Sequence, residues 1–349
     1  MTDDATSHTV WHDVLKPRVE GQGWEDVEKP SDRLPARARD VVREEVWNLS
    51  RQPVGLSVRF RTDASRIMAR WTLDGDPSPD CRKTRLRNGG LDCYGKASDG
   101  TWRWVGPGQP TTPPDCEATL NGDRLDGEAR AYRVYLPTGV GVSSLAIGVD
   151  EGAAFEPMPH DERRPVVVYG TSIVHGATVS RPGMAHTSII SRRLDYPLVN
   201  LGFGGNGRME AEVAGLLAEL DAALYVVDCL PNIGADLVPR RLPRLVEAIR
   251  EARPDVPILF VGDRLYGDAS FIPARREANR AKCDAQREAI ERLEAGGVAG
   301  LHLVESANFF GDDFEGTIDG SHPTDLGSMR MAEALLPKVS SILNAEGVL

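Results

Sequence analysis

In the second half of the chain, short apolar runs alternate with longer segments of helical periodicity. The apolar runs occupy residues 165–170, 197–202, 223–228, 257–263 and 301–305. The intervening and following segments predict amphipathic helices at residues 184–194, 209–220, 242–252, 273–295 and 326–343. A strand that is apolar along its whole length is buried on both faces, so this alternation predicts a parallel sheet covered by helices on both sides. We therefore expect a compact, doubly wound α/β domain with five strands.

The first half of the chain has a different pattern. Short β-rich runs lie at residues 54–62, 66–74, 91–97, 101–106, 129–137 and 142–150, with Asp-Gly and Asn-Gly turn signals between some of them. No long segment of helical periodicity separates these runs, which predicts an all-β sandwich of the jelly-roll type. Residues 151–164 are polar and contain two prolines, which predicts a linker. We therefore expect a β-sandwich domain over residues 1–155 and an α/β domain over residues 160–349.

Composition restricts the partners of the protein. The net charge of -11 disfavours binding to nucleic acid or to an anionic membrane surface. No apolar run is long enough to span a membrane, and the N-terminal residues lack the pattern of a secretory signal. The five cysteines show no C-x-x-C spacing, which argues against a zinc site and a disulfide framework. We expect a cytoplasmic protein that acts on a small molecule or saccharide.

Polar motifs follow four of the five predicted strands, at the sheet edge where ligands bind. Ser172 comes two residues after the first strand, and a glycine-rich loop containing Gly205 follows the second. Asn232 lies in Asp-Cys-Leu-Pro-Asn after the third strand, and Asp319-Gly-Ser-His322 follows the fifth. Together these residues offer a nucleophile, oxyanion donors, a base and a carboxylate that orients the base. That set is the one that serine-dependent acyl transfer requires.

Each motif also has an ordinary structural explanation when taken alone. A serine in the position of Ser172 can cap a helix, Asn232 can be a turn residue, and an Asp-x-x-His turn is common on surfaces. Their occurrence after different strands favours the catalytic interpretation, because all of them would meet at one edge of the sheet. The sequence therefore predicts a catalytic triad of Ser172, His322 and Asp319.

These residues resemble the sequence blocks of the SGNH (GDSL-like) hydrolases, a family named for a serine, a glycine, an asparagine and a histidine. Ser172 matches the block I nucleophile, and Gly205 matches the block II glycine. Asn232 matches the block III asparagine, and Asp319 and His322 match the Asp-x-x-His of block V. The resemblance implies an oxyanion hole formed by the backbone N–H groups of Ser172 and Gly205 and by the side-chain amide of Asn232.

Longer strings are similar to one bacterial branch of this family. The run over residues 170–210 resembles that branch, and so does Gly90-Leu-Asp-Cys-Tyr94, which is similar to the Gly-x-Asp-Leu-Tyr string of its N-terminal domain. Cys93 stands in place of the leucine, and Thr171 stands where the Gly-Asp-Ser-Leu signature has aspartate. The resemblance implies a flavodoxin-like three-layer α/β/α catalytic domain and an acyl hydrolase that needs no metal or organic cofactor.

The substrate expected from these features is a short-chain ester. Many SGNH relatives deacylate sugars, and the chain lacks a long apolar segment that could form a lid over a lipid-sized tunnel. We therefore expect an acetyl ester of a sugar or of another polar alcohol. Four polar residues are predicted near the rim of the pocket, where they would contact the substrate: His175, Arg181, Arg208 and Glu210.

Two other functions remain open at this point. Gly202, Gly204 and Gly207 spell G-x-G-x-x-G, and Asp228 ends the next strand, where a ribose-binding acid would stand in a dinucleotide site. That motif follows the second strand, however, whereas a dinucleotide fingerprint follows the first. The other alternative is a non-catalytic carbohydrate-binding protein in which the triad is a relic. Turnover of a simple acetyl ester would separate it from an enzyme.

Overall fold

The computed structural model describes residues 8–15, 19–78, 82–305 and 308–349, and the chain forms two compact units. The first unit comprises Met1–Arg33, Arg51–Glu162 and Ser180–Gly183. The second unit comprises Leu34–Ser50, Arg163–Val179 and Met184–Leu349. Two short segments thus belong to a different unit from the chain that flanks them, which the sequence did not predict. The polar stretch predicted as a linker contains the change of unit between residues 162 and 163.

A five-stranded parallel sheet forms the centre of the second unit and confirms the predicted fold class. The strands pair in the order β11-β10-β12-β13-β14, and every pairing is parallel. This flavodoxin-like order places a topological switch point between β10 and β12, beyond whose carboxyl ends such sheets bind ligands. The strands are β10 (Val166–Gly170), β11 (Leu198–Gly202), β12 (Leu224–Asp228), β13 (Ile258–Val261) and β14 (Leu301–Val304).

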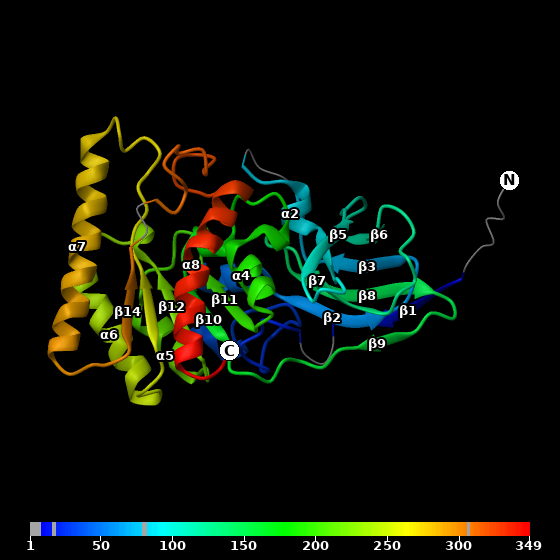
Figure 1. The fold of residues 1–349 in the computed structure, drawn as a ribbon, viewed down its shortest axis with the longest axis horizontal. Coiled ribbons are helices and arrows are strands. Elements are labelled where there is room, and N and C mark those ends of the chain that lie inside the picture. The colour runs from blue at the N-terminus through cyan, green and yellow to red at the C-terminus, as the bar shows by residue number, and fades with distance from the viewer. Residues whose placement is uncertain (1–7, 16–18, 79–81, 306–307) are drawn as a thin grey trace. The chain divides into compact units, whose positions relative to one another are not determined.

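Helices cover both faces of this sheet (Figure 1). They are α3 (Ser172–His175), α4 (His186–Leu194), α5 (Ala211–Glu219), α6 (Val238–Ala252), α7 (Pro273–Ala295) and α8 (Asp325–Ala345). Neighbouring side chains of a strand point to opposite faces. In β12, Val226 packs into a core cluster with apolar residues of α4 and α8, whereas the hydroxyl of Tyr225 donates to the carbonyls of Leu217 and Leu220 at the end of α5. The α4–α8 and α5 layers therefore lie on opposite faces of the sheet.

Two antiparallel sheets form the first unit, as the β-rich runs predicted. Their strand orders are β1-β8-β3-β6 and β5-β4-β7-β2-β9. Side chains from both sheets, among them Trp71 and Phe60, form one buried cluster. The strands are β1 (Thr9–Asp13), β2 (Ser57–Thr62), β3 (Ile67–Leu73), β4 (Leu91–Lys96), β5 (Trp102–Gly108), β6 (Asp115–Thr119), β7 (Arg130–Tyr135), β8 (Val142–Asp150) and β9 (Phe155–Pro157).

The sequence missed three of these strands, β1, β6 and β9. Each one has five residues or fewer and lies at the edge of its sheet. An edge strand has one pairing partner and is partly exposed, so its sequence carries little apolar alternation. β9 lies inside the stretch predicted as a linker and pairs with β2. The sequence also did not predict several short helices: η1 (Ala36–Asp40), α1 (Glu44–Ser50), α2 (Arg85–Gly89), η2 (Pro182–Met184) and η3 (Leu230–Asn232).

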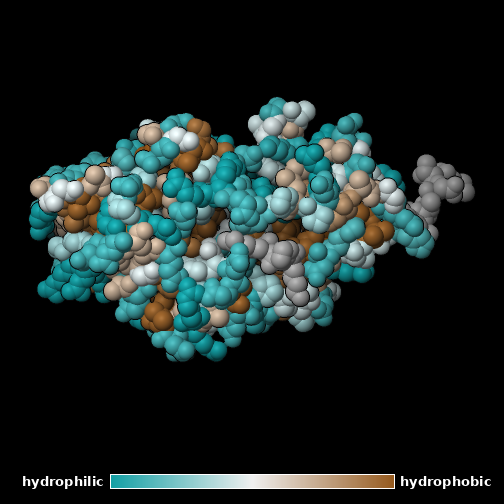
Figure 2. All heavy atoms as spheres, turned by 90° about the horizontal axis from the view of Figure 1, so that it is seen from below, coloured by the Kyte–Doolittle hydropathy of each residue, from teal (hydrophilic) through white to brown (hydrophobic). Residues whose placement is uncertain are grey.

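Most side chains on the face seen in Figure 2 are hydrophilic, and the apolar ones form small groups between them. Most of the large apolar residues are instead concentrated in the interior of each unit. None of the helices in the described part of the chain is long and apolar enough to cross a membrane.

Candidate active site

The end of β10 presents Ser172 at the switch point of the parallel sheet. A Cβ atom on Gly170 would lie 2.5 Å from the carbonyl oxygen of Asp228 on β12, so only glycine allows the two strand ends to approach this closely. Thr171 caps α3, because its hydroxyl accepts a hydrogen bond from the Ile173 N–H group. The capping role that Ser172 could have filled is therefore taken by its neighbour. The Oγ atom of Ser172 lies instead 2.8 Å from Nε2 of His322.

A tight turn orients His322. The Asp319 carboxylate accepts hydrogen bonds from the backbone N–H group of His322 at 2.9 Å and from Nδ1 of its ring at 2.8 Å. Gly320 has a φ of 85°, which the turn requires and which glycine adopts without strain. Thr178, in the loop after α3, donates to the carbonyl of Pro323 and so connects the two loops. The structure thus brings the three predicted triad residues into one hydrogen-bonded chain.

The glycine-rich loop after β11 packs against the segment that carries Ser172. A Cβ atom on Gly204 would lie 3.6 Å from the Cβ atom of Ser172, and one on Gly207 would lie only 2.0 Å from the carbonyl oxygen of Gly170. Gly205, between them, is exposed and has a φ of 70°. The backbone N–H groups of Gly205 and Ser172 have no acceptor among the residues that the structure describes.

Asn232 ends η3, directly after β12, and its backbone N–H group donates to the carbonyl of Cys229. Its Oδ1 atom is buried, and its side chain makes no hydrogen bond with any described residue. A half-buried amide without a partner is uncommon, because a buried polar atom that loses water costs free energy unless it is bonded. The Nδ2 group likewise donates to no described residue, so the amide is available to a ligand.

His175 and Arg181 form hydrogen bonds with residues outside the predicted triad. His175 is only 3% exposed, and its Nδ1 atom lies 3.2 Å from the carbonyl oxygen of Gly202. Arg181 belongs to the first unit, where it forms an ion pair of 2.7 Å with the fully buried Asp92 and a hydrogen bond with the hydroxyl of Tyr94. Burial raises the pKa of Asp92, and Arg181 opposes that shift. The Gly-x-Asp-Leu-Tyr-like string thus holds Arg181 in place.

Arg208 and Glu210 follow the glycine-rich loop in the second unit. The Nε atom of Arg208 donates to the carbonyl of Gly205 at 2.8 Å. Both carboxylate oxygens of Glu210 accept hydrogen bonds from Arg43, at 2.8 and 3.0 Å. Sequence reasoning missed Arg43, because an arginine within Val-Val-Arg-Glu-Glu resembles any charged surface residue before a helix. No local signal connects it to a loop more than 160 residues away.

The carboxylate that a dinucleotide site would need is already occupied. Asp228 is 1% exposed and forms a two-fold hydrogen-bonded ion pair with the equally buried Arg264. Gly202 and Gly207 pack against α3 and the end of β10, where any Cβ atom would clash with backbone. The glycines of G-x-G-x-x-G thus serve close packing between loops, and Asp228 has no free oxygen for a ribose.

Two further groups near the loops stay uncharged. Burial raises the pKa of the Tyr169 hydroxyl well above its usual value, and the neighbouring Cys229 adds to that shift. Burial likewise raises the pKa of the Cys229 thiol, followed by the effect of Asp228, which disfavours the thiolate form. The Tyr169 hydroxyl accepts hydrogen bonds from the backbone N–H groups of Arg208 and Met209 and so supports the glycine-rich loop from below.

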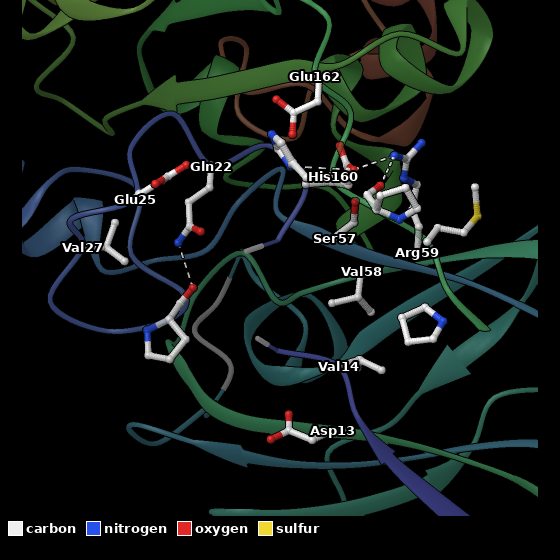
Figure 3. Close-up of a pocket in the computed structure, with 15 residues that line it drawn as sticks. Asp13, Val14, Gln22, Glu25, Val27, Ser57, Val58, Arg59, His160 and Glu162 are labelled. Atoms are coloured by element: carbon white, nitrogen blue, oxygen red, sulfur yellow. Dashed lines mark hydrogen bonds and ion pairs between the residues drawn. The ribbon is translucent and has the colours of Figure 1, made fainter. Parts of the chain in front are cut away.

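The described part of the chain contains no group of three or more His, Cys, Asp or Glu residues arranged to hold a metal ion. A cavity of about 590 Å³ lies within the first unit (Figure 3). Its walls include Gln22, which donates to the carbonyl of Pro30, and Arg59, which pairs with Glu20 at 2.6 Å. None of the predicted site residues lines this cavity.

Comparison with known proteins identifies the family. Residues 163–340 match the model of the GDSL-like lipase/acylhydrolase family, and residues 9–155 match the GxDLY domain, the N-terminus of SGNH hydrolase-type esterases. The chain is similar to a protein from Bacteroides ovatus described as a GDSL-like lipase, with 32% identity, a TM-score of 0.90 and coverage of 97% of this chain and 98% of that one. The chain belongs to the GDSL-like lipase/acylhydrolase family, a family of hydrolases, as its motifs predicted.

More distant structures share the fold. A salicylyl-acyltransferase from a tetracycline biosynthetic pathway is 19% identical, with a TM-score of 0.73 and coverage of 99% of both chains. A family two carbohydrate esterase from Cellvibrio japonicus is 13% identical, with a TM-score of 0.58 and coverage of 97% of this chain and 98% of that one. Among curated proteins, none matches the sequence.

Proposed function

We propose that this protein is a serine esterase that cleaves a short-chain carboxylic ester, with Ser172, His322 and Asp319 as its catalytic triad. The observation that carries the proposal is the continuous hydrogen-bonded chain from the Ser172 hydroxyl through the His322 ring to the Asp319 carboxylate, with 2.8 Å at each contact. A positioned base beside a hydroxyl, oriented in turn by a carboxylate, is the arrangement that activates serine for acyl transfer.

The reaction begins when Ser172 Oγ attacks the acyl carbon and its proton moves to Nε2 of His322. Asp319 stabilises the resulting imidazolium and holds the proton-bearing Nδ1 atom toward itself. The tetrahedral intermediate collapses as His322 protonates the leaving alcohol oxygen, which leaves an ester on Ser172. Water then attacks this ester with His322 again as the base, releasing the carboxylic acid and the free Ser172 hydroxyl.

The oxyanion of each tetrahedral intermediate would be bound by the backbone N–H groups of Ser172 and Gly205 and by the Asn232 amide. The support is that the two backbone N–H groups and the Nδ2 group of Asn232 donate to no described residue. Donors that are fixed before the reaction need no reorganisation when charge develops on the oxygen. Removing one such donor typically lowers turnover by about 10²–10³-fold.

The acyl group in this proposal is small, with acetyl as the first candidate, and the alcohol is a sugar or another polar alcohol. Arg208 supports a polar alcohol, because its side chain is half-exposed beside the glycine-rich loop and only its Nε atom is bonded to a described residue. A sugar is also in keeping with the description of one protein of the same fold as a carbohydrate esterase. An extra methylene gains about 0.8 kcal/mol only where a pocket buries it.

The decisive experiment compares wild type with Ser172→Ala on aryl acetate and on a panel of acetylated sugars. We expect the variant to lose essentially all turnover. Ser321→Ala, which removes another serine next to His322, serves as the matched control and should retain most activity. A fluorophosphonate probe should label the Ser172 peptide in wild type. Turnover above about a tenth of wild type in Ser172→Ala, or labelling elsewhere, would refute the mechanism.

Chain length tests the acyl group separately. The ratio of kcat/KM for aryl acetate over aryl octanoate should exceed one. A steady rise from acetate to octanoate would instead indicate a long acyl pocket. If wild type turns over no ester in the panel but binds the sugars, the non-catalytic carbohydrate-binding alternative would replace the proposal.

A further inference from the structure

The glycine-rich loop is held by a short hydrogen-bonded relay that starts at Arg43. The Nη1 atom of Arg43 donates to Oδ1 of Asn206 at 2.9 Å, while its Nε and Nη2 atoms donate to the two carboxylate oxygens of Glu210. The Nδ2 atom of Asn206 in turn donates to the carbonyl oxygen of Gly204 at 2.8 Å. Both ends of the Asn206 amide are therefore fixed, its oxygen by the guanidinium and its nitrogen by the loop backbone.

The Gly204 carbonyl and the Gly205 N–H group belong to the same peptide unit. A peptide bond is planar and trans, so its C=O and N–H groups point in opposite directions. A hydrogen bond that fixes the carbonyl of Gly204 on one side therefore fixes the direction of the Gly205 N–H group on the other. Glycine imposes no preference of its own here, since it adopts positive and negative φ with similar ease. The orientation of this donor must come from contacts such as that with Asn206.

We propose that Arg43 and Asn206 are positioning residues that aim the Gly205 N–H group at the oxyanion. Arg43 selects the Asn206 rotamer in which the amide nitrogen faces Gly204, and Asn206 then sets the peptide plane. This inference rests on the proposed serine esterase function and extends it to a segment far from the motifs. It assigns Glu210 to the support of the loop, whereas the sequence suggested contact with the substrate.

The segment that carries Arg43 is itself anchored in the second unit. Val42 and Val46 on either side of Arg43 are 7% and 0% exposed. The same segment also contacts both ends of α5, because Arg43 pairs with the N-cap residue Glu210 and Arg37 pairs with the last residue, Glu219. Arg37 offers a matched control: it is an arginine of the same segment, it pairs with a glutamate of the same helix, and its contact lies at the end of α5 remote in sequence from the loop.

The test compares Asn206→Asp, Arg43→Ala and Arg37→Ala in ester hydrolysis. Asn206→Asp keeps the Arg43 contact but cannot donate to Gly204. We expect kcat to fall by about 10–100-fold in Asn206→Asp and Arg43→Ala, since misplacing one oxyanion donor forfeits much of its effect, while KM changes less than about two-fold. Arg37→Ala should stay within about two-fold of wild type. Arg43→Lys keeps the positive charge but cannot make the three hydrogen bonds of the planar guanidinium to Glu210 and Asn206, so its kcat should lie between those of wild type and Arg43→Ala.

Two measurements separate positioning from general destabilisation. The affinity for phenylboronic acid, which forms a tetrahedral adduct on serine, should fall by the same factor as kcat. The double variant Arg43→Ala/Asn206→Asp should be no slower than Asn206→Asp alone, because both residues act on one peptide unit. Multiplicative losses, or loss of kcat without loss of boronate affinity, would overturn the proposal.

A readout without turnover keeps this inference separate from the esterase proposal. In the Ser172→Ala background, Arg43→Ala should change the residual dipolar coupling of the Gly205 N–H bond, which reports the direction of that bond, whereas Arg37→Ala should not. If Ser172→Ala retained activity, the esterase mechanism would fail, yet this NMR measurement would still test the relay. An unchanged dipolar coupling at Gly205 would refute the relay even if the triad is correct.

Discussion

Tyr169→Phe should show how strongly the Tyr169 hydroxyl stabilises the end of the glycine-rich loop. Tyr169 lies on β10 and is 1% exposed, and its hydroxyl accepts hydrogen bonds of 3.2 Å from the N–H groups of Arg208 and Met209. The substitution removes this acceptor and almost no volume. Met209 is buried and has a φ of 52°, a strained value for a residue other than glycine. Its N–H group would lose the hydroxyl oxygen and keep only the weaker contact with the Cys229 thiol.

The magnitude follows from the two donors. A buried N–H group that loses its oxygen acceptor costs about 1–3 kcal/mol, and the Arg208 N–H group adds less because that residue is half-exposed and water can reach it. We expect Tyr169→Phe to lower the free energy of unfolding by about 2–3 kcal/mol, measured by urea denaturation. Because the loop carries Gly205, we also expect kcat for an aryl acetate to fall by about ten-fold, a loss typical of a shifted catalytic donor.

Tyr225→Phe provides the matched control. Tyr225 is also 1% exposed, and its hydroxyl also bonds to two backbone groups, but these are the carbonyls of Leu217 and Leu220 at the far end of α5 from the loop. This variant should lose about 1–2 kcal/mol of stability and keep its kcat. A loss below about 0.5 kcal/mol in Tyr169→Phe, or equal kcat in the two variants, would show that the hydroxyl does not support the loop.

Two other predictions concern the triad and a buried histidine. Asp319→Asn should lower kcat by about 100-fold or more with little change in KM, since an amide cannot balance the charge of the His322 imidazolium; a loss below about five-fold in steady-state assays would contradict the role of Asp319. Burial, followed by the charge of Arg264, lowers the pKa of His186 from 6.5 to about 3. Between about pH 6.5 and pH 3, His186 is therefore protonated in the unfolded chain and neutral in the folded protein. As the pH falls through this window, the free energy of unfolding should decrease by about 1.4 kcal/mol per pH unit. Urea denaturation at several pH values should show this slope in wild type and not in His186→Gln.

The sequence predicted the α/β unit well because its signals are local. Each of its strands is apolar through its own residues, and each long helix carries its own amphipathic pattern, so no distant partner is needed to recognise them. Sites form beyond the carboxyl ends of parallel strands, and this rule predicted that Ser172, Asn232 and His322 lie near one another. The structure joins Ser172 directly to His322.

The edge strands of the β-sandwich were not predicted, because they depend on partners that are distant in the sequence. β1, β6 and β9 are short, and each is held by pairing with a single neighbour from a distant part of the chain. β1, for example, pairs with β8 more than 130 residues later. Such pairing is determined by which backbone groups the folded chain leaves open, and a five-residue segment does not encode it.

By itself, the sequence therefore determined the fold class and pointed to Ser172, His322 and Asp319, which the structure joins by hydrogen bonds, because periodicity and position after a strand are properties of neighbouring residues. Only the tertiary structure decided that Arg43, 163 residues before Asn206, contacts the glycine-rich loop, and that Asp228 is neutralised by Arg264. An arginine has the same appearance in a sequence whether it faces water or a loop. Its partner is selected by closure of the chain, which brings together groups that no local pattern relates.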